Sequence, residues 1–267
     1  MKSGTKYFLI LQRKLQFFIR ILSLLLSKLS SWTGLVTIPL DDQQVLFHVR
    51  YPQERRHALD HEIHYFRKLM EAGGNDQCFW DIGANIGLFS VSYAKRYPGS
   101  KVMAFEPMPL NYLILQENIA LNHLRNIAAH QIAIGNDNSK VTLRGKKEPG
   151  WGGSSLLREE IEGEDIFVVD VFSVDHLCLT RKYPAPTFVK IDVEGFEMEV
   201  FKGMEQIIKA HHPRLFVELH EDYLNKIGIS LENALDLLCT EGYRLEFMEK
   251  HKSGNQFQCI FVPKAKS

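Results

Sequence analysis

Two groups of polar residues in this 267-residue chain have the types and spacing for chemistry on a bound ligand. The first begins with the segment Asp81–Gly87 (DIGANIG), which follows an apolar run and opens a helix-like segment. Glycines at such a turn let the backbone bend sharply and approach a ligand closely. The acid before the first glycine suits a cationic or amino-bearing ligand better than a pyrophosphate. Glu106 ends the next apolar run, where a carboxylate can accept hydrogen bonds from both hydroxyls of a ribose.

The second group follows two later apolar runs. Asp192 and Glu194 come directly after the run 187–191, and Glu218 and His220 end the next run. Ligands of open α/β sheets bind beyond the carboxyl ends of the strands, so we expect both groups to surround one crevice. His220 is the candidate general base, because the pKa of an unperturbed histidine lies near neutrality. Asp192 and Glu194 are candidates to orient it or to contact the substrate.

Alternating strands and helices must position these residues. Apolar runs of strand length are found at 78–82, 101–105, 127–134, 188–191 and 215–219, and helical segments at 86–96, 110–124, 198–209 and 231–240. This alternation is typical of a mostly parallel sheet with helices on both faces, an α/β fold. The last two strands, 244–248 and 257–262, are joined by a short polar loop and must therefore pair antiparallel.

The pattern predicts one α/β domain over residues 34–267, preceded by a separate helix at 1–33. Residues 34–75 contribute strands at 35–38 and 44–49 and a helix at 55–71, and residues 76–267 form the core. A long insertion, 136–176, interrupts the alternation after the third core strand. Insertions of this kind often carry substrate contacts, and its segment Trp151–Ser155 could contact substrate or cofactor.

The N-terminal segment differs from the rest in charge. Residues 1–40 contain six Lys and Arg and no acid, so they carry +6 and the remainder −6 in a chain of net charge zero. Polar residues recur every three or four positions within 7–31, which predicts a basic amphipathic helix. Its charges disfavour a membrane-spanning or cleaved segment. We expect residues 7–31 to make peripheral contact with an anionic membrane, to join copies in a homo-oligomer, or to pack on the chain's own domain.

Charge and cysteines limit the other partners. The balanced total charge gives no electrostatic case for nucleic-acid binding. The four cysteines lie far apart in sequence and form no CxxC pair, which disfavours a cysteine-based zinc site. Isolated thiols are typical of reduced, cytosolic proteins. We therefore expect a cytoplasmic protein, either free or associated with a membrane through the N-terminal helix.

Four motifs, in the same order, give the chain its resemblance to the FkbM family of class I S-adenosylmethionine-dependent methyltransferases. They are DIGANIG at 81–87, FEP at 105–107, KIDVEG at 190–195 and VELH at 217–220. The resemblance covers roughly Glu62 to Glu221, and Glu62 stands where family members often carry a glutamate. It implies a Rossmann-like sheet of seven strands with an antiparallel last strand inserted, and S-adenosylmethionine as cofactor.

The resemblance also implies residue roles. The expected cofactor-binding residues are Asp81, Gly83, Asn85, Gly87, Glu106 and Ala133. Asp81, Gly83 and Asn85 would border the methionine part of the cofactor, Glu106 the ribose, and Ala133 the adenine. The expected acceptor is a hydroxyl of a small molecule, a sugar or a glycan. We expect no resident metal, since many methyltransferases with this sheet work without one. Asp192, Glu218 and His220 nevertheless offer two carboxylates and an imidazole, which suffice for a divalent ion.

These features predict an O-methyltransferase, with two alternatives. An NAD(P)-dependent oxidoreductase would need a GxGxxG turn, but Asn85 occupies the position of its second glycine, and the terminal hairpin also counts against this class. A non-catalytic, membrane-associated scaffold could retain the fold. For a scaffold, the intact acids Asp81 and Glu106 would be unexpected.

Overall fold

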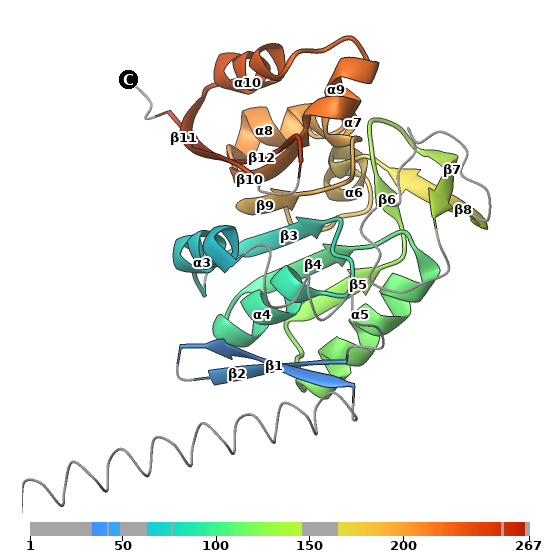
Figure 1. Cartoon of the computed structure of the whole chain (residues 1–267), viewed down its shortest axis with the longest axis vertical. Helices are drawn as coiled ribbons and strands as arrows, with labels where there is room; N and C mark the ends of the chain where they lie inside the picture. The colour runs from blue at the N-terminus through green and yellow to red at the C-terminus, as the bar shows by residue number, and fades with distance from the viewer. Residues whose placement is uncertain are drawn as a thin grey trace, which may run out of the picture.

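The structure is a computed structural model that describes residues 34–41, 43–48, 63–75, 77–145, 165–251 and 254–264. Its centre is a seven-stranded sheet with the order β11-β12-β10-β9-β3-β4-β5 (Figure 1). The strands are β3 (Cys78–Ile82), β4 (Lys101–Phe105), β5 (Ile127–His130), β9 (Phe188–Ile191), β10 (Arg214–His220), β11 (Tyr243–Lys250) and β12 (Gln256–Pro263). The first five are parallel, and β12 runs antiparallel between β10 and β11. The predicted sheet and its antiparallel hairpin are confirmed.

The two central strands, β3 and β9, are buried at every residue. Because side chains alternate between the faces of a strand, Trp80 and Ile82 pack into one apolar cluster and Phe79 into another on the opposite face. Asp81 and Lys190 are the charged residues of these strands and pair with each other. A sheet that is apolar on both faces needs a helical layer on each.

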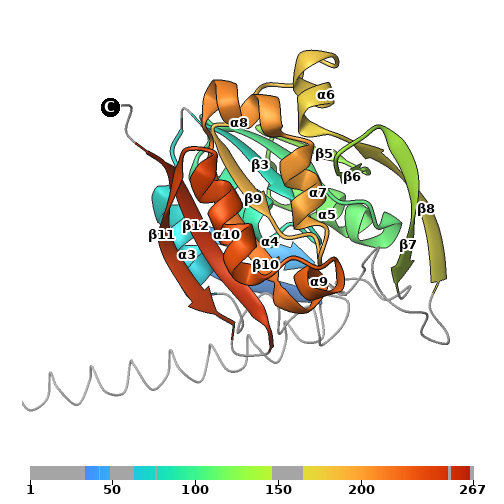
Figure 2. The same cartoon turned by 90° about the horizontal axis from the view of Figure 1, so that it is seen from above.

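Helices supply both layers (Figure 2). On the face of Phe79 lie α3 (Ile63–Ala72), α4 (Leu88–Arg96) and α5 (Pro109–Leu121). On the face of Trp80 lie α6 (Val174–Leu179), α7 (Glu197–Lys202), α8 (Glu205–His211), α9 (Glu221–Lys226) and α10 (Leu231–Thr240). Two short helices, α6 and α9, were not expected from the sequence, because six residues are too few for a clear helical periodicity.

An N-terminal hairpin of β1 (Leu35–Leu40) and β2 (Gln43–His48) packs against α5. Its inward side chains, such as Val45 and Phe47, join the cluster on the face of Phe79. Two amide side chains, Asn118 of α5 and its C-cap residue Asn122, hydrogen-bond the backbone of β2. Asn122 accepts from Leu46 N–H (3.0 Å) and donates to Leu46 O (2.7 Å), and Asn118 accepts from His48 N–H (2.7 Å).

The run 127–134 is two strands, not the single predicted one. β5 ends at His130 in the central sheet, whereas β6 (Ala133–Ile134) pairs with β8 (Asp165–Phe172) in a second sheet. The order of this sheet is β6-β8-β7, with β7 at Ser139–Gly145. The apolar pattern alone does not reveal this exchange of partners, because Ile134 pairs with Phe172, nearly forty residues later.

The segment 198–209 is likewise two helices instead of one. α7 ends at Lys202 and α8 begins at Glu205, with Gly203 between them. A Cβ at Gly203 would lie 1.8 Å from the carbonyl oxygen of Gly135, so the backbones touch there. The Gly203 carbonyl accepts a hydrogen bond from Asp175 N–H (2.9 Å). This tertiary contact interrupts the helix.

Several expectations concern residues outside the described ranges. These are the helix at 1–33, the start of the helix predicted at 55–71, Glu62, and Trp151–Ser155. The division of the chain at residue 33 therefore stays a prediction. Within the described residues, no helix has the length and apolar character needed to cross a membrane.

Candidate functional site

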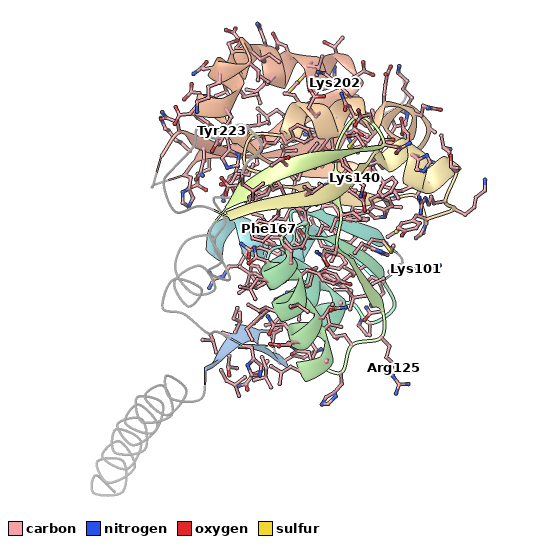
Figure 3. The ribbon with its side chains drawn as sticks, turned by 90° about the vertical axis from the view of Figure 1, so that its right-hand side faces the viewer. Lys101, Arg125, Lys140, Phe167, Lys202 and Tyr223 are labelled. Carbon is pink, nitrogen blue, oxygen red and sulfur yellow. The ribbon has the colours of Figure 1, made fainter. Side chains whose placement is uncertain are left out.

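A cavity lies at the carboxyl ends of β3, β4 and β9. It encloses about 690 Å³ of space, part of it open to solvent. Its lining includes Gly83, Asn85, Glu106, Ala133, Asp192 and Glu194. Four of the six residues expected to bind cofactor therefore share one cavity with two of the expected catalytic residues. Figure 3 looks towards this edge of the sheet and shows β7 and β8, with Lys140 and Phe167 labelled, across it.

The turn after β3 is shaped by close backbone contacts. Gly83 has a φ of 84°, and a Cβ on it would lie 1.8 Å from the carbonyl oxygen of Asp192. Gly83 and Ala84 both donate their N–H to the carbonyl of Phe105 (3.0 Å each). This packing holds the turn against the ends of β4 and β9, and it leaves Gly83 and Asn85 facing the cavity.

Gly87 serves the helix that follows and does not line the cavity. It has a φ of 97° at the N-cap of α4, and a Cβ there would meet Leu115 and Val91. Its place in the motif is thus explained by the packing of α4 against α5. The expected contact between Gly87 and a cofactor has no counterpart among the residues that line the cavity.

Glu106 joins the two loops that form one wall of the cavity. Its Oε2 accepts a hydrogen bond from Asn85 N–H (2.8 Å), and its Oε1 accepts one from Met108 N–H (2.9 Å). Burial raises the pKa of Glu106 to about 7, although these hydrogen bonds oppose the rise. Each carboxylate oxygen has a second lone pair, so Glu106 can still accept hydrogen bonds from a ligand in the cavity.

Asp81 lies behind the turn and not in the cavity lining. It is completely buried, and Lys190 Nζ lies 3.6 Å from its Oδ1 and 3.0 Å from Asp192 Oδ2. Burial raises the pKa of Asp81, and the positive charge of Lys190 opposes that rise. The arrangement places Asp81 where it can hold Lys190, and through it Asp192. The expected contact of Asp81 with the methionine part of the cofactor stays a prediction.

The far wall of the cavity is apolar. Ala133 lines it as expected, together with Phe105, Met108 and Phe196. Gly135, next along the chain from β6, donates its N–H to Phe172 O (3.1 Å) and so ties this wall to β8. Such a surface suits a flat, uncharged ring.

His220 is held between carboxylates at the end of β10. Its Nδ1 lies 2.8 Å from Glu197 Oε1, and its Nε2 lies 3.4 Å from Glu194 Oε2. Burial by itself lowers the pKa of His220, but the hydrogen bond to Glu197 and the charges of the surrounding carboxylates outweigh it and raise the pKa to about 10. These carboxylates favour the protonated ring, which leaves less of the neutral form that could accept a proton at neutral pH. The general-base role of His220 stays a prediction.

The four residues predicted at the ends of β9 and β10 do come together. Asp192, Glu218 and His220 each offer a ligand-type atom, and these atoms lie within 4.8 Å of one another. Glu194 contacts His220 and lines the cavity. Sequence reasoning missed Glu197, a buried acid in the first turn of α7. Its only signal was its position among the apolar residues of that helix.

Comparisons with known proteins agree with this architecture. The model of the methyltransferase FkbM domain matches residues 81–245. The hexuronic acid methyltransferase AglP of Haloferax volcanii is 28% identical, over 58% of this chain and 60% of its own length. The 31-O-demethyl-FK506 methyltransferase FkbM of Streptomyces tacrolimicus is 27% identical, over 59% of this chain and 70% of its own.

A solved structure shows the same fold. The crystal structure of the methyltransferase FkbM from Methylobacillus flagellatus KT aligns with a TM-score of 0.50 and 21% identity, over 74% of this chain and 46% of that one. The chain spans about 60% of the length of several curated methyltransferases that it matches. The domain match covers more than half of the residues and includes the strand ends that build the cavity. The chain belongs to the FkbM family of methyltransferases.

Proposed function

We propose that the protein transfers a methyl group from S-adenosylmethionine to an oxygen atom of a small-molecule or glycan acceptor. The observation that carries the proposal is the cavity at the strand ends, where Glu106, the backbone turn at Gly83 and the acids Asp192 and Glu194 meet. Family membership supports the reaction class. The Haloferax and Streptomyces relatives, a hexuronic acid methyltransferase and a 31-O-demethyl-FK506 methyltransferase, support an oxygen acceptor.

The residues present fit this cofactor. Glu106 keeps acceptor capacity for ribose hydroxyls, and the apolar wall at Ala133 and Phe196 suits an adenine. The absence of a side chain at Gly83 leaves backbone next to the cavity. Asp192 and Glu194 place carboxylates where a cationic group would be stabilised. When bound, the cofactor supplies a methyl group on a positively charged sulfur.

The chain's own contribution is mainly positioning. Transfer to a hydroxyl needs the two reacting atoms in line and in close contact, and this alignment lowers the entropic part of the barrier. Asp81 and Lys190 hold Asp192 in place, and Glu106 holds the loops after β3 and β4. Glu194 is a quarter exposed and lines the cavity, so it remains our candidate to contact the acceptor.

Calorimetry with S-adenosylhomocysteine tests the cofactor assignment. We expect saturable binding to the full chain and no binding of NAD. Replacing the cavity acid, Glu106→Ala, should weaken binding by at least about tenfold, because roughly 1.4 kcal/mol or more of charge-assisted hydrogen bonding is lost. The matched control Glu117→Ala, on the exposed side of α5, should leave it unchanged. NAD binding without S-adenosylhomocysteine binding would instead favour the oxidoreductase alternative.

The acceptor class has its own test. Transfer of labelled methyl groups should be measured with uronic-acid oligosaccharides and with hydroxylated small molecules, in parallel with amine and thiol analogues. Labelled ethers or esters are the expected products. Exclusive labelling of amines or thiols would contradict an oxygen acceptor.

We also propose, from sequence alone, that residues 7–31 bring the enzyme to an anionic membrane surface. The +6 charge of residues 1–40 and the single polar stripe support this proposal.

A further inference from the structure

We propose that Asp192, Glu218 and His220 form a binding site for a divalent cation beside the methyl-donor cavity. Their ligand-type atoms all lie within 4.8 Å of one another. With bonds of about 2.1–2.2 Å, neighbouring ligands of one ion are about 3.0–3.5 Å apart. The three side chains therefore need to close in by up to about 1–2 Å to share an ion, which is within the range of small side-chain rotations.

The sheet itself assembles this set. β9 and β10 are parallel neighbours with Ile191 opposite Val217, so Asp192, which directly follows β9, lies close to Glu218 of β10. His220 follows Glu218 by two residues and projects from the same face of β10. The register of β9 and β10 thus brings the ends of these strands, and with them the three residues, to one edge of the sheet.

His220 has the surroundings of a metal ligand. Its Nδ1 faces a carboxylate oxygen of Glu197 at 2.8 Å, while its buried Nε2 makes no hydrogen bond and lies 3.4 Å from Glu194 Oε2. Metal-binding histidines commonly engage a carboxylate through the ring nitrogen that does not bind the ion, which fixes the tautomer and orients the ring. Glu197 is itself completely buried and held by Gly195 N–H (2.9 Å). His220 is only 3% exposed, so its orientation is set before any ligand arrives.

Local charge favours a cation at this point. The carboxylates of Glu194, Glu197 and Asp192 surround the His220 ring, and Glu218 adds a further buried acid. Lys190 also binds Asp192, but it is shared with Asp81. A dipositive ion that replaces the Nε2 proton of His220 would offset this concentration of buried negative charge, which is otherwise costly in a low-dielectric interior.

The donor set indicates which ions to expect. Two carboxylates and one imidazole are a mixed set of oxygen and nitrogen ligands. This set suits Mn²⁺ better than Mg²⁺, because Mg²⁺ prefers oxygen ligands alone. Three protein ligands leave coordination positions open for water or for an acceptor. Asp192 lines the cavity, so those positions lie at its edge. If the proposed function holds, an acceptor hydroxyl bound to the ion would become more acidic, and no protein base would then be needed to activate it.

Titration of the full chain with Mn²⁺ tests the site. The protein should be stripped with a chelator, dialysed, and followed by electron paramagnetic resonance and calorimetry. We expect one site per chain, with nitrogen hyperfine coupling from one histidine. The substitutions Asp192→Asn, Glu218→Gln and His220→Asn should each weaken binding at least tenfold, and the nitrogen coupling should vanish in His220→Asn. The exposed controls Glu232→Gln and His211→Ala should bind Mn²⁺ like the unsubstituted protein.

The nitrogen coupling in the unsubstituted protein needs no variant, so the test survives even if a substitution prevents folding. Glu197→Gln offers a second measure, because loss of a carboxylate behind a metal-bound histidine typically weakens binding about 10- to 100-fold. Absence of Mn²⁺ binding at millimolar concentration, or binding without nitrogen coupling, would overturn the proposal. S-adenosylhomocysteine binding is measured separately and reports on the proposed function. If the unsubstituted protein binds Mn²⁺ but not S-adenosylhomocysteine, the proposed function is wrong and the proposed cation site is supported.

Discussion

The Nδ1 atom of His220 lies 2.8 Å from Oε1 of Glu197, and both side chains are almost completely buried. They come from β10 and α7, so this contact links the central sheet to the helical layer on one face. Glu197 also accepts a hydrogen bond from Gly195 N–H, in the turn that carries Glu194. One buried carboxylate therefore orients the histidine and fixes the loop beside the cavity.

Removing that carboxylate should destabilise the fold. In Glu197→Ala, both the histidine ring and Gly195 N–H lose a buried partner, and breaking a buried pair typically costs about 3–5 kcal/mol. The isosteric Glu197→Gln keeps hydrogen-bonding capacity and should cost less. Urea denaturation measures both free energies of unfolding. The exposed substitution Glu205→Ala is the control and should change stability by less than about 1 kcal/mol. Equal stability of Glu197→Ala and the control would contradict this interpretation.

Gly83 should tolerate no side chain. Ala at this position would adopt a φ of 84° with its Cβ 1.8 Å from Asp192 O. We expect about 1–2 kcal/mol of backbone strain and a further ~1–3 kcal/mol from displacing that carbonyl, together with loss of S-adenosylhomocysteine binding.

Gly228 is the matched control for Gly83. Its φ is 75°, but no atom lies within 4 Å of an added Cβ, so Gly228→Ala should show the backbone cost alone. Thermal unfolding and calorimetry are measured on both variants. The loss of stability in Gly228→Ala gives the backbone strain, and the additional loss in Gly83→Ala gives the cost of the contact with Asp192 O. If both variants lost the same stability, the close approach to Asp192 would have no energetic consequence.

The stability of the protein should depend on pH through Glu106. Its pKa is about 7 in the folded protein and near 4.5 when unfolded, so the folded state binds more protons between these values. The contribution of Glu106 is therefore fully present below about pH 4.5 and is lost as pH rises through 7, by at most about 1.4 kcal/mol per pH unit. The denaturation midpoint of Glu106→Gln should not show this loss of stability with rising pH, whereas the midpoint of Glu117→Gln should show it as the unsubstituted protein does. Identical pH profiles for all three proteins would show that Glu106 does not titrate in this window.

Membrane contact should depend on the basic stripe at the N-terminus. The full chain should sediment with vesicles that contain about 30% phosphatidylserine, and less so at high salt, because exposed charges are screened. Charge reversal by Arg13→Glu with Arg20→Glu should reduce sedimentation, since each basic residue contributes about 1 kcal/mol. Neutral vesicles are the control. Equal binding to neutral and anionic vesicles by both proteins would exclude an electrostatic contact.

The central sheet could be predicted because its strands are buried on both faces. β3, β4 and β9 have the bounds that their short apolar runs indicate. The predicted bounds are wrong where contacts between distant parts of the chain determine where a strand or helix ends. Ile134 pairs with β8 instead of continuing β5, and Gly203 breaks a helix because it touches Gly135. No local pattern contains either partner.

The sequence allows us to predict which residues lie together at the site, but not their charge states or their contacts. Strand ends identify Glu106, Asp192, Glu194 and His220 as neighbours, since parallel strands end at one edge of the sheet. The charge state of His220 could not be predicted, because it depends on Glu197, which approaches from a different element. The complete burial of Asp81 and its pairing with Lys190 could not be predicted either, because both depend on neighbouring strands.

The antiparallel strand β12 has a consequence for how the protein is made. It lies between β10 and β11 and pairs Glu218 with Gln258 and His220 with Gln256. During synthesis, β10 therefore has β9 on one side but lacks its other neighbour until residues 256–263 have left the ribosome. The edge of the sheet that bears His220 stays unpaired for that interval, and such edges are prone to wrong partners. Completion of this site is thus expected to be a late event in folding, and substitutions that weaken β12 should first reduce the yield of folded protein.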